Sequence, residues 1–296
     1  MVKQVERKLE PGLYLVATPI GAARDITLRT LDILASADVI AAEDTRSLRK
    51  LMEIHGIALG DRPLLAYHDH NGARVRPRLM ADISGGKSVV YASEAGTPMV
   101  ADPGFDLARA AIAEGMPLTS APGPSAVITA LTLSGLPTDR FLFAGFLPNT
   151  ASQRKSALSA LVDVPATLVF YESPKRIAAM LRDAATVLGG SRPAALAREL
   201  TKKFEEVQRG TLDTLAEEAA AHPRKGEMVV LVDRASSQNI SFSEIEEMLQ
   251  DALAQMSVRD AADTVSQALG LKRRQVYQMA LKLAGDTESD ETGSGT

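Results

Sequence analysis

Cysteine is absent from the 296-residue sequence, and its absence excludes several kinds of chemistry. Without a thiol the chain has no disulfide, no thiolate metal ligand and no cysteine nucleophile. The sequence also lacks any run near the roughly 18 to 20 consecutive apolar residues that a membrane-spanning helix needs. Residues 1–11 are charged and lack the apolar core of a secretory signal peptide. We therefore expect a cytoplasmic protein without a membrane span.

The acidic residues behind the net charge of −4 gather near one end of the chain. Residues 239–256 contain four acidic residues and no basic one, and residues 285–296 contain four more acidic residues. Residues 257–284 carry a basic excess, and the first 238 residues are close to neutral. The overall charge therefore does not exclude a nucleic-acid partner, because the acidity lies outside the body of the chain.

Short apolar segments alternate with helical patterns over the first 235 residues, which predicts an α/β protein. The predicted strands are residues 13–18, 39–42, 64–67, 88–92 and 117–120, followed by 141–144, 167–171, 194–199, 204–209 and 228–233. The predicted helices include residues 27–36, 45–55, 105–114, 125–133, 151–161, 174–188 and 211–220. We expect two α/β domains, at residues 12–122 and 123–236.

Beyond a polar linker at residues 236–241 the pattern is purely helical, over residues 243–255 and 257–283. The second segment resembles a helix-turn-helix, with Gly270 at the turn and Lys272, Arg273 and Arg274 opening its second helix. A small helical bundle with a solvated basic face explains the pattern equally well. We expect a helical domain at residues 241–284 and a disordered tail at 285–296, where acidic and small polar residues dominate.

Three chain breaks, each rich in glycine or proline, follow predicted strands at residues 17–21, 93–104 and 121–126. In open α/β sheets, ligands bind at the carboxyl ends of the strands, so these breaks predict a ligand site. The first break is neither a Gly-x-Gly-x-x-Gly turn nor a P-loop with its lysine, which disfavours a dinucleotide or a nucleoside triphosphate. In the second, Gly96 permits close approach of a ligand, and Asp102 before a proline suits a helix N-cap.

Several segments together resemble the tetrapyrrole methylase superfamily. They are residues 13–21, 25–27, 41–46, 67–71, 95–98, 102–104, 122–126, 170–173, 197–202 and 225–228. Within that superfamily they are similar to a family that methylates the 2′-hydroxyl of a cytidine in small-subunit (16S) ribosomal RNA. The resemblance covers residues 12–234. It departs from the family pattern at Ala22 and Ala23, where Asn-Leu is usual, and at Glu94, where Asp is usual.

The resemblance implies a two-domain tetrapyrrole-methylase-like α/β fold, with a small helical appendage and S-adenosylmethionine in the cleft between the domains. It also implies a homodimer that needs no metal and acts on small-subunit ribosomal RNA or the 30S particle during ribosome biogenesis. The cofactor-binding residues that it implies are Pro19, Ile20, Gly21, Glu94, Gly96, Thr97, Pro98, Val100, Ser125, Ala126, Tyr171, Arg198 and Gly226.

Methyl transfer to a ribose needs an in-line approach and a group that removes the hydroxyl proton. The candidates for the catalytic role are Glu43, Asp44, Arg46 and Glu199. Asp44 as a helix cap, with Arg46 paired to a carboxylate, explains those two residues equally well. The candidates for contact with RNA are His68, His70, Lys202 and Lys203. The two histidines lack a third metal ligand, so we expect no metal site there.

Two other functions are compatible with the sequence. One keeps the cofactor but methylates a tetrapyrrole or another small molecule. The other is a nucleic-acid-binding regulator, in which residues 257–283 read the nucleic acid and the α/β body senses a ligand. The basic helices and the segments at 67–71 and 197–202 favour the RNA substrate over the small molecule. The regulator is disfavoured because the helical appendage is short and the loop pattern lies in the α/β body.

Overall fold

The computed structural model describes residues 7–100, 102–235, 242–269, 271 and 273–291. They form two compact units, one of residues up to 161 with 167–233, and one of residues 162–166 with those from 234 onward. The predicted linker, the turn at Gly270, Lys272 and residues 292–296 lie outside the described residues. None of the described helices is both long and apolar enough to cross a membrane.

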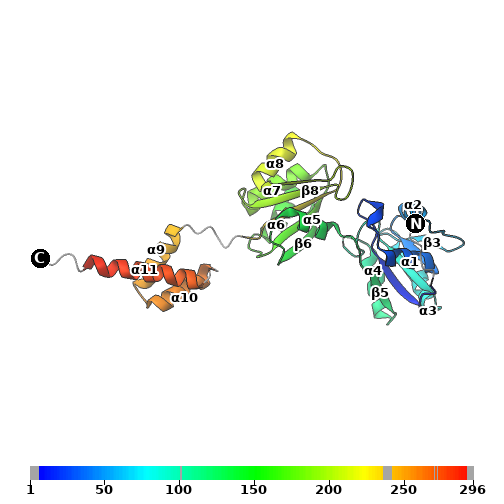
Figure 1. Ribbon diagram of the computed structural model, residues 1–296, viewed down its shortest axis with the longest axis horizontal. Helices are drawn as coiled ribbons and strands as arrows, with labels where there is room; N and C mark the ends of the chain where they lie inside the picture. Colours follow the sequence, from blue (N-terminus) through cyan, green and yellow to red (C-terminus); the bar gives the residue numbers. More distant parts are fainter. Residues whose placement is uncertain (1–6, 101, 236–241, 270, 272, 292–296) are drawn as a thin grey trace. The chain divides into compact units, whose positions relative to one another are not determined.

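The first lobe of the larger unit is built on a parallel sheet in the order β3-β2-β4-β1-β5 (Figure 1). Its strands are β1 (Gly12–Val16), β2 (Val39–Ala42), β3 (Leu64–Ala66), β4 (Ser88–Ala92) and β5 (Leu118–Ala121). Its helices are α1 (Leu28–Ser36), α2 (Thr45–Ile54), α3 (Gly72–Ser84) and α4 (Gly104–Ala113), with a 3-10 turn at Ala23–Asp25. The central strands are buried along their whole length, as in parallel sheets with helices on both faces.

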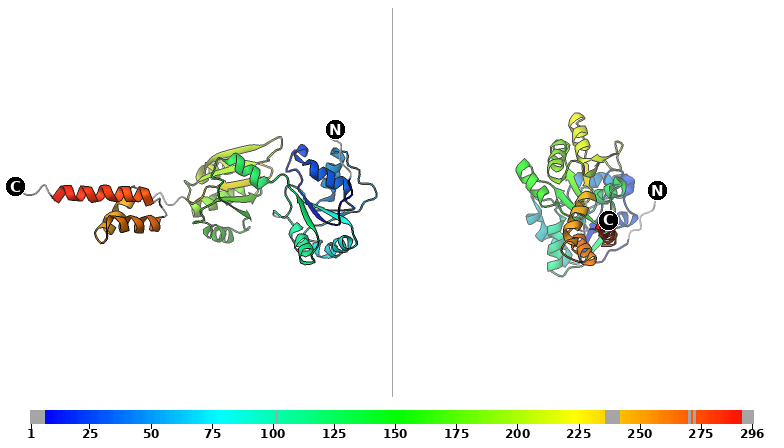
Figure 2. Two further views of the ribbon diagram at one scale, coloured as in Figure 1. Left: turned by 60° about the horizontal axis from the view of Figure 1, so that its bottom comes forward. Right: turned by 90° about the vertical axis from the view of Figure 1, so that its left-hand side faces the viewer.

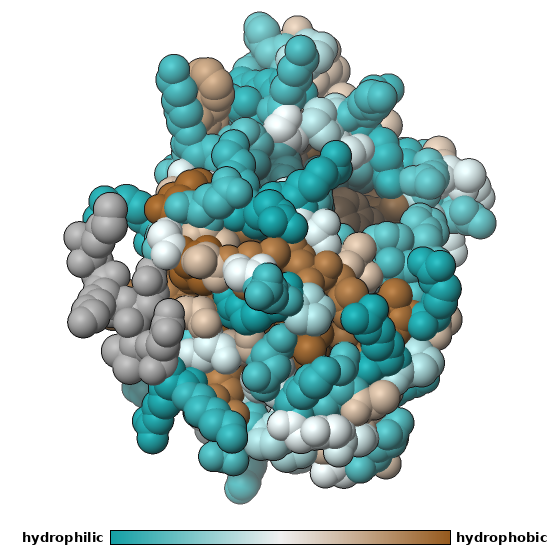
Figure 3. Space-filling view, turned by 90° about the vertical axis from the view of Figure 1, so that its right-hand side faces the viewer, coloured by the Kyte–Doolittle hydropathy of each residue, from teal (hydrophilic) through white to brown (hydrophobic). Residues whose placement is uncertain are grey.

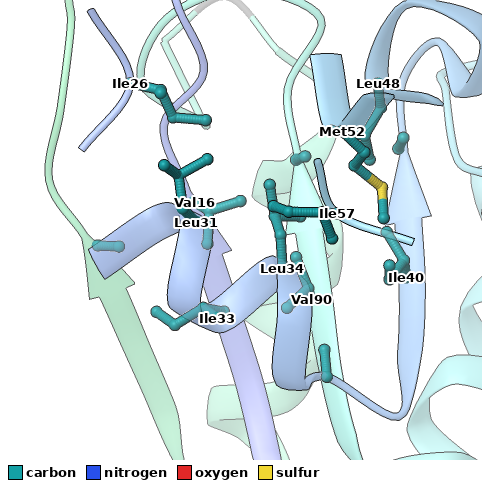
Figure 4. Close-up of a cluster of buried hydrophobic side chains, with 14 residues drawn as sticks. Val16, Ile26, Leu31, Ile33, Leu34, Ile40, Leu48, Met52, Ile57 and Val90 are labelled. Atoms are coloured by element: carbon teal, nitrogen blue, oxygen red, sulfur yellow. The ribbon is translucent and has the colours of Figure 1, made fainter. Parts of the chain in front are cut away.

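The helices that follow β1 and β4 cover opposite faces of this sheet. Leu34 of α1 packs in a cluster with Val90 of β4 (Figure 4). Leu107 of α4 packs with Tyr91, the next residue of the same strand. Because successive strand residues point to opposite faces, α1 and α4 lie on opposite sides of the sheet. The strands β1 and β4 are neighbours, and the chain leaves their carboxyl ends toward opposite faces of the sheet. A crevice therefore opens between these two ends.

The second lobe has a mixed sheet in the order β6-β7-β10-β8-β9. Among its neighbouring strands, β6 and β7 pair in parallel and the other three pairs are antiparallel. Its strands are β6 (Phe141–Phe146), β7 (Thr167–Glu172), β8 (Pro193–Arg198), β9 (Glu206–Thr211) and β10 (Met228–Val232). Its helices are α5 (Ala126–Ser134), α6 (Ala151–Ser159), α7 (Ile177–Leu188) and α8 (Leu212–Ala221). Val127 and Leu131 of α5 cover one face by packing on Val169 and Leu231. Phe170 therefore points to the other face, where it is fully buried.

We predict that Phe170→Ala lowers the free energy of unfolding by about 3 to 5 kcal/mol, because it leaves a cavity in the second lobe. Urea unfolding followed by circular dichroism measures the change. Phe204→Ala is the matched control, since that side chain is 62% exposed and its loss is expected to change stability by no more than about 0.5 kcal/mol. Equal losses in the two variants would contradict the assignment of Phe170 to the core.

The smaller unit contains the helices α9 (Phe242–Leu253), α10 (Val258–Leu269) and α11 (Arg273–Glu291), which pack on one another (Figures 1 and 2). Their shared core consists of Ile245, Leu249, Ala262, Val265, Val276 and Ala280. Helix α11 continues to Glu291, so the prediction of a disordered tail is wrong for residues 285–291. Once a helix is nucleated, each added residue costs little, which lets α11 extend through this polar segment.

Helix α3 was not among the helices predicted from the sequence. Its first turns contain three arginines and Pro77, which obscure the apolar periodicity of the segment. Leu79, Met80 and Ile83 supply the buried side of its second half. Packing of these three side chains on the sheet holds the segment helical despite its weak local signal.

Candidate functional site

The loops that follow β1 and β4 are hydrogen-bonded to each other. Thr18 and Gly96 exchange two backbone hydrogen bonds, and each N···O distance is 3.0 Å. The Ser93 hydroxyl also donates to the Gly96 carbonyl oxygen, at 2.7 Å. Gly96 has a φ of 81°, in the left-handed region that side chains with a Cβ rarely enter. The first and second sequence breaks therefore form one rim at the crevice between β1 and β4.

The third break, at residues 122–126, packs against the same rim. The Thr97 hydroxyl donates to the Pro124 carbonyl oxygen at 2.8 Å. Gly123 lies so close to the chain after β1 that an added Cβ would stand 2.8 Å from the Cβ of Ala17. Ser125 is the N-cap residue of α5, yet its side chain makes no capping hydrogen bond. The first N–H groups of α5 thus lack that partner at the edge of the site.

The loop after β8 brings the second lobe to this rim. The backbone N–H of Ala22 donates to the Thr201 hydroxyl at 3.0 Å. A Cβ added to Gly21 would stand 2.6 Å from both the Thr201 hydroxyl oxygen and Cγ of Lys202. Glu199 and Thr201 have φ values of 49° and 62°, which are uncommon for residues other than glycine. The close approach of the two loops therefore depends on Gly21 and on a sharply bent backbone after β8.

A cavity of about 790 Å³ opens among these loops. Its volume lies in the range of roughly 300 to 1,000 Å³ that small-molecule sites occupy. Most of the residues that the sequence assigned to the cofactor, to catalysis or to contact with RNA line it. They are Pro19, Ile20, Gly21, Glu43, Glu94, Gly96, Thr97, Val100, Ser125, Ala126, Tyr171, Glu199, Lys202 and Gly226.

Asp44 and Arg46 do not line the cavity. Asp44 is the N-cap of α2, and its Oδ1 accepts from the backbone N–H of Arg46 at 2.8 Å. This hydrogen bond, together with one from Ser47, holds the pKa of Asp44 below its ordinary value. The Arg46 side chain is 92% exposed and pairs with Asp44 at 3.5 Å. Both residues therefore have the structural contacts that were the alternative to a catalytic role.

Pro98, Arg198, His68, His70 and Lys203 are also absent from the cavity lining. The guanidinium of Arg198 pairs with Glu206 at 3.3 Å and donates to the Lys225 carbonyl oxygen at 3.0 Å. His68 and His70 follow the edge strand β3, and their ring centroids are 6.0 Å apart. In the described part of the chain, no three side chains are grouped as a metal site would require.

Other lining residues were not among the predicted site residues. They are Ser47, Ala95, Phe146, Glu172, Ser173, Pro174, Leu200, Glu227, Met228 and Val229. Glu172 had a usable signal, because it directly follows the predicted strand that ends at Tyr171. Phe146 and Val229 had none, since they lie in the strands β6 and β10 and outside every segment that carried the resemblance. Only the order of the strands in the second sheet places them at the cavity.

The lining carries more negative than positive charge. Its acidic residues are Glu43, Glu94, Glu172, Glu199 and Glu227. Lys202 donates to Glu199 and to Glu227, each at 3.0 Å, and burial opposes its charge while these hydrogen bonds raise its pKa. The Glu227 backbone N–H and the Lys202 ammonium together lower the pKa of Glu199. These hydrogen bonds stabilise the ionised form of Glu199, which makes it a poor proton acceptor.

Glu43 differs from Glu199 in its surroundings. It follows β2, and its Oε2 accepts from the Glu94 backbone N–H at 3.0 Å. Burial raises the pKa of Glu43, the Glu94 N–H opposes this, and the neighbouring charges of Asp102 and Glu94 raise it further. Among the carboxylates of the cavity, Glu43 therefore has the environment of a general base.

The cavity suits a ligand that is cationic and partly apolar. Carboxylates supply the negative charge, while Ile20, Val100 and Phe146 supply apolar surface. S-adenosylmethionine has a sulfonium, an ammonium group and an adenine ring, so the residues fit the cofactor that the sequence implies. The same carboxylates repel phosphate, so a nucleic-acid acceptor can enter this cavity only with an uncharged part.

Comparison with protein families gives two matches along the chain. Residues 12–216 match the model of the Tetrapyrrole (Corrin/Porphyrin) Methylases. Residues 241–284 match the model described as the RsmI C-terminal HTH domain. The first match covers the first lobe and the second lobe as far as the start of α8, and the second covers α9, α10 and the first part of α11.

Curated relatives resemble the chain over nearly its whole length. Ribosomal RNA small subunit methyltransferase I of Mesorhizobium japonicum is 48% identical, over 99% of this chain and all of its own. The protein of the same name from Escherichia coli O157:H7 is 39% identical, over 92% of this chain and 96% of its own.

Solved structures share the fold of the two lobes. The methyltransferase CobJ has a TM-score of 0.59 at 18% identity, covering 78% of this chain and 97% of its own. Uroporphyrin-III-C-methyltransferase from Thermus thermophilus has a TM-score of 0.54 at 23% identity, covering 76% and 95%. The predicted tetrapyrrole-methylase-like fold is therefore confirmed.

Proposed function

Because the chain belongs to the family of ribosomal RNA small subunit methyltransferase I, we propose that it methylates a cytidine 2′-hydroxyl of 16S ribosomal RNA with S-adenosylmethionine. The membership confirms the predicted enzyme class, a methyltransferase, and the predicted family. The names of the relatives favour ribosomal RNA over a tetrapyrrole as acceptor, and catalysis over ligand sensing alone.

The acidic cavity at the crevice between β1 and β4 is the observation that carries this proposal. A cationic methyl donor gains from the carboxylates, whereas the phosphates of RNA are held outside by the same charge. A ribose is the uncharged part of the RNA backbone, and it can reach inward while the phosphates stay at the mouth. The bound cofactor supplies a methyl group on a positively charged sulfur, so positioning of the hydroxyl provides much of the rate.

We assign cofactor binding to the rim loops at residues 19–21, 94–100 and 125–126, with Tyr171 and Gly226 from the second lobe. The ring of Tyr171 meets that of Phe146 edge-on at a centroid distance of 5.6 Å. The second lobe thus contributes an aromatic wall to the cavity. Pro98 shapes the loop, and Arg198 acts by fixing the segment around Lys225.

We assign the acceptance of the ribose proton to Glu43. Glu199 orients Lys202, and Asp44 and Arg46 form the start of α2. His68, His70, Lys202 and Lys203 remain our candidates for contact with RNA, at the mouth of the cavity or beyond it. Lys202 lines the cavity, so it is placed to meet a phosphate next to the target ribose.

We further propose that the enzyme is a homodimer in the cytoplasm, where it meets the 30S particle. An interface is supported by large apolar side chains that are more than a third exposed. In the second lobe they include Ile128, Phe141 and Leu142. On the face drawn in Figure 3, hydrophobic surface also runs between hydrophilic side chains. Sedimentation equilibrium measures the oligomeric state, and a monomer at micromolar concentration would contradict this proposal.

The substrate is tested by incubating the protein with labelled S-adenosylmethionine and either 30S particles, naked 16S ribosomal RNA or a tetrapyrrole such as uroporphyrinogen. We expect one 2′-O-methylcytidine per RNA, identified by mass spectrometry of nuclease fragments. Label in the tetrapyrrole alone would support the small-molecule alternative. Cofactor binding without any methylated acceptor would support the ligand-sensing regulator.

A further inference from the structure

Asp102 is not the N-cap of α4 that its sequence position suggested, because Pro103 takes that place, and its side chain has other contacts. Its Oδ1 accepts from the Gly104 backbone N–H at 2.7 Å and from that of Met99 at 3.3 Å. It also accepts from the hydroxyl of Tyr91, at 2.9 Å. Tyr91 is fully buried in the middle of β4, so a buried phenol is directed at this carboxylate. A Cβ on Gly104 would lie 2.4 Å from the Tyr91 ring and 2.7 Å from Oδ1, so Gly104 makes the approach possible.

The second oxygen of Asp102 lacks a hydrogen bond. Its Oδ2 is buried and receives no donor from the residues that the structure describes. A buried carboxylate oxygen without a donor is destabilising, because it has lost its hydrogen bonds to water and gained none from the protein. The carboxyl group of Glu43 is close enough to Asp102 for hydrogen bonding between the two side chains. A proton carried by Glu43 would supply the missing donor.

We propose that Asp102 is a positioning residue that shares with Glu43 the proton taken from the ribose hydroxyl. The proposal rests on the proposed function, because it assigns a new residue to the same reaction. Asp102 does not line the cavity and acts through Glu43, which does. Tyr91 and the two backbone N–H groups all donate to Oδ1 of Asp102, so Oδ2 is the oxygen left to share a proton with Glu43.

The reaction balances with both carboxylates ionised at the start. The ribose oxygen forms a bond to the methyl carbon, the carbon–sulfur bond breaks, and its electron pair stays on sulfur. The hydroxyl proton moves to Glu43 and is shared with Oδ2 of Asp102. It is later released to water through the cavity. The released proton carries away the positive charge that the sulfur loses, so the charges balance and no further reactant is needed.

The groups that surround Glu43 favour this behaviour. Glu94 and Asp102 face it from the loop after β4, and Tyr91 lies behind Asp102. Tyr67 of the β3–α3 connection meets the Tyr91 ring edge-on at 5.7 Å, and Arg76 of α3 lies next to Tyr67. Two carboxyl groups so close titrate as a pair, and the negative charge of one makes the other a stronger base.

The pH dependence of kcat tests the proposal in two variants with opposite expected shifts. Asp102→Asn keeps an acceptor for Tyr91 and the two N–H groups, but removes a charge and donates an N–H to Glu43. The acid limb of kcat should therefore move down by about one pH unit. Tyr91→Phe removes the donor that stabilises the Asp102 anion, so its acid limb should move up. A purely structural role for Asp102 would lower activity without moving the limb.

Asp106→Asn is the control, since this carboxylate on α4 is half-exposed and pairs with Arg76 rather than Glu43. Its acid limb should stay with that of the wild type. The midpoint of Glu43, followed by NMR with ¹³C-carboxyl glutamate and assigned with Glu43→Gln, should fall in Asp102→Asn whether or not the acceptor is RNA. An unchanged midpoint, or an unchanged limb, overturns the shared proton. Absence of RNA methylation by the wild type would instead overturn the proposed function.

Discussion

Replacing Gly21 by valine is expected to weaken the binding of S-adenosylmethionine by roughly 100-fold. The first added carbon alone would stand 2.6 Å from the Thr201 hydroxyl and from Lys202, and 2.9 Å from the Leu200 carbonyl oxygen. Because one of these neighbours is backbone, the loops must separate, and overpacking of this kind costs about 1 to 3 kcal/mol. The separation also breaks the hydrogen bond from Ala22 to Thr201. Calorimetric titration of the protein with the cofactor measures the change.

Gly60→Ala provides the control for this experiment. Gly60 has a φ of 59°, so a side chain there strains the backbone, but nothing lies within 4 Å of an added Cβ. We expect it to lower stability slightly while leaving the cofactor Kd unchanged. An unaltered Kd in Gly21→Val, with the circular dichroism spectrum preserved, would refute the assignment of this close approach to the cofactor site.

Glu43→Gln is expected to lower kcat at least about 100-fold, the smaller end of the range for removing a general base. The amide keeps the size of the side chain and can still accept from the Glu94 N–H, but it cannot take a proton. The cofactor Kd should change by less than about tenfold, or 1.4 kcal/mol. Single-turnover methylation of 30S particles, with the Kd from calorimetry, separates the two effects.

The wild-type enzyme should also lose activity on acidification while the pH is still above 4.5, the ordinary pKa of glutamate. Burial and nearby negative charges raise the pKa of Glu43, so its basic form is lost first as the pH falls. Glu53→Gln, on the exposed side of α2, should leave kcat and its pH profile unchanged. Full activity in Glu43→Gln would assign the proton to water or to another carboxylate.

Much of the fold was predictable because the evidence for it is local. The strand at residues 88–92 consists of a serine and four apolar residues, and its observed bounds agree with those predicted. The rim at Gly96 was predictable because a left-handed backbone conformation requires a glycine, and that glycine is visible in the sequence. Helix α3 was not predictable in this way, since its arginines and Pro77 hide a buried side that only the sheet reveals.

The site was predictable in its loops and less so in its side chains. Asp44 and Arg46 follow a strand, as Glu43 does, yet they turn into the first turn of α2 rather than the cavity. Phe146 and Val229 line the cavity from strand positions that no local pattern marks as functional. The contact of Glu43 with the Glu94 backbone joins segments that are 51 residues apart.

The sequence by itself determined the acidic, glycine-rich loops at the strand ends and, through their combination, the family. These features depend on backbone conformation and residue type, which neighbours along the chain largely dictate. The tertiary structure decided which charged groups meet. It paired Glu199 with Lys202, which stabilises the Glu199 anion, and it placed Glu43 beside Asp102, which makes Glu43 the stronger base. The physical reason is that proton affinity depends on burial and on nearby charges, and strand order, not sequence spacing, brings those charges together.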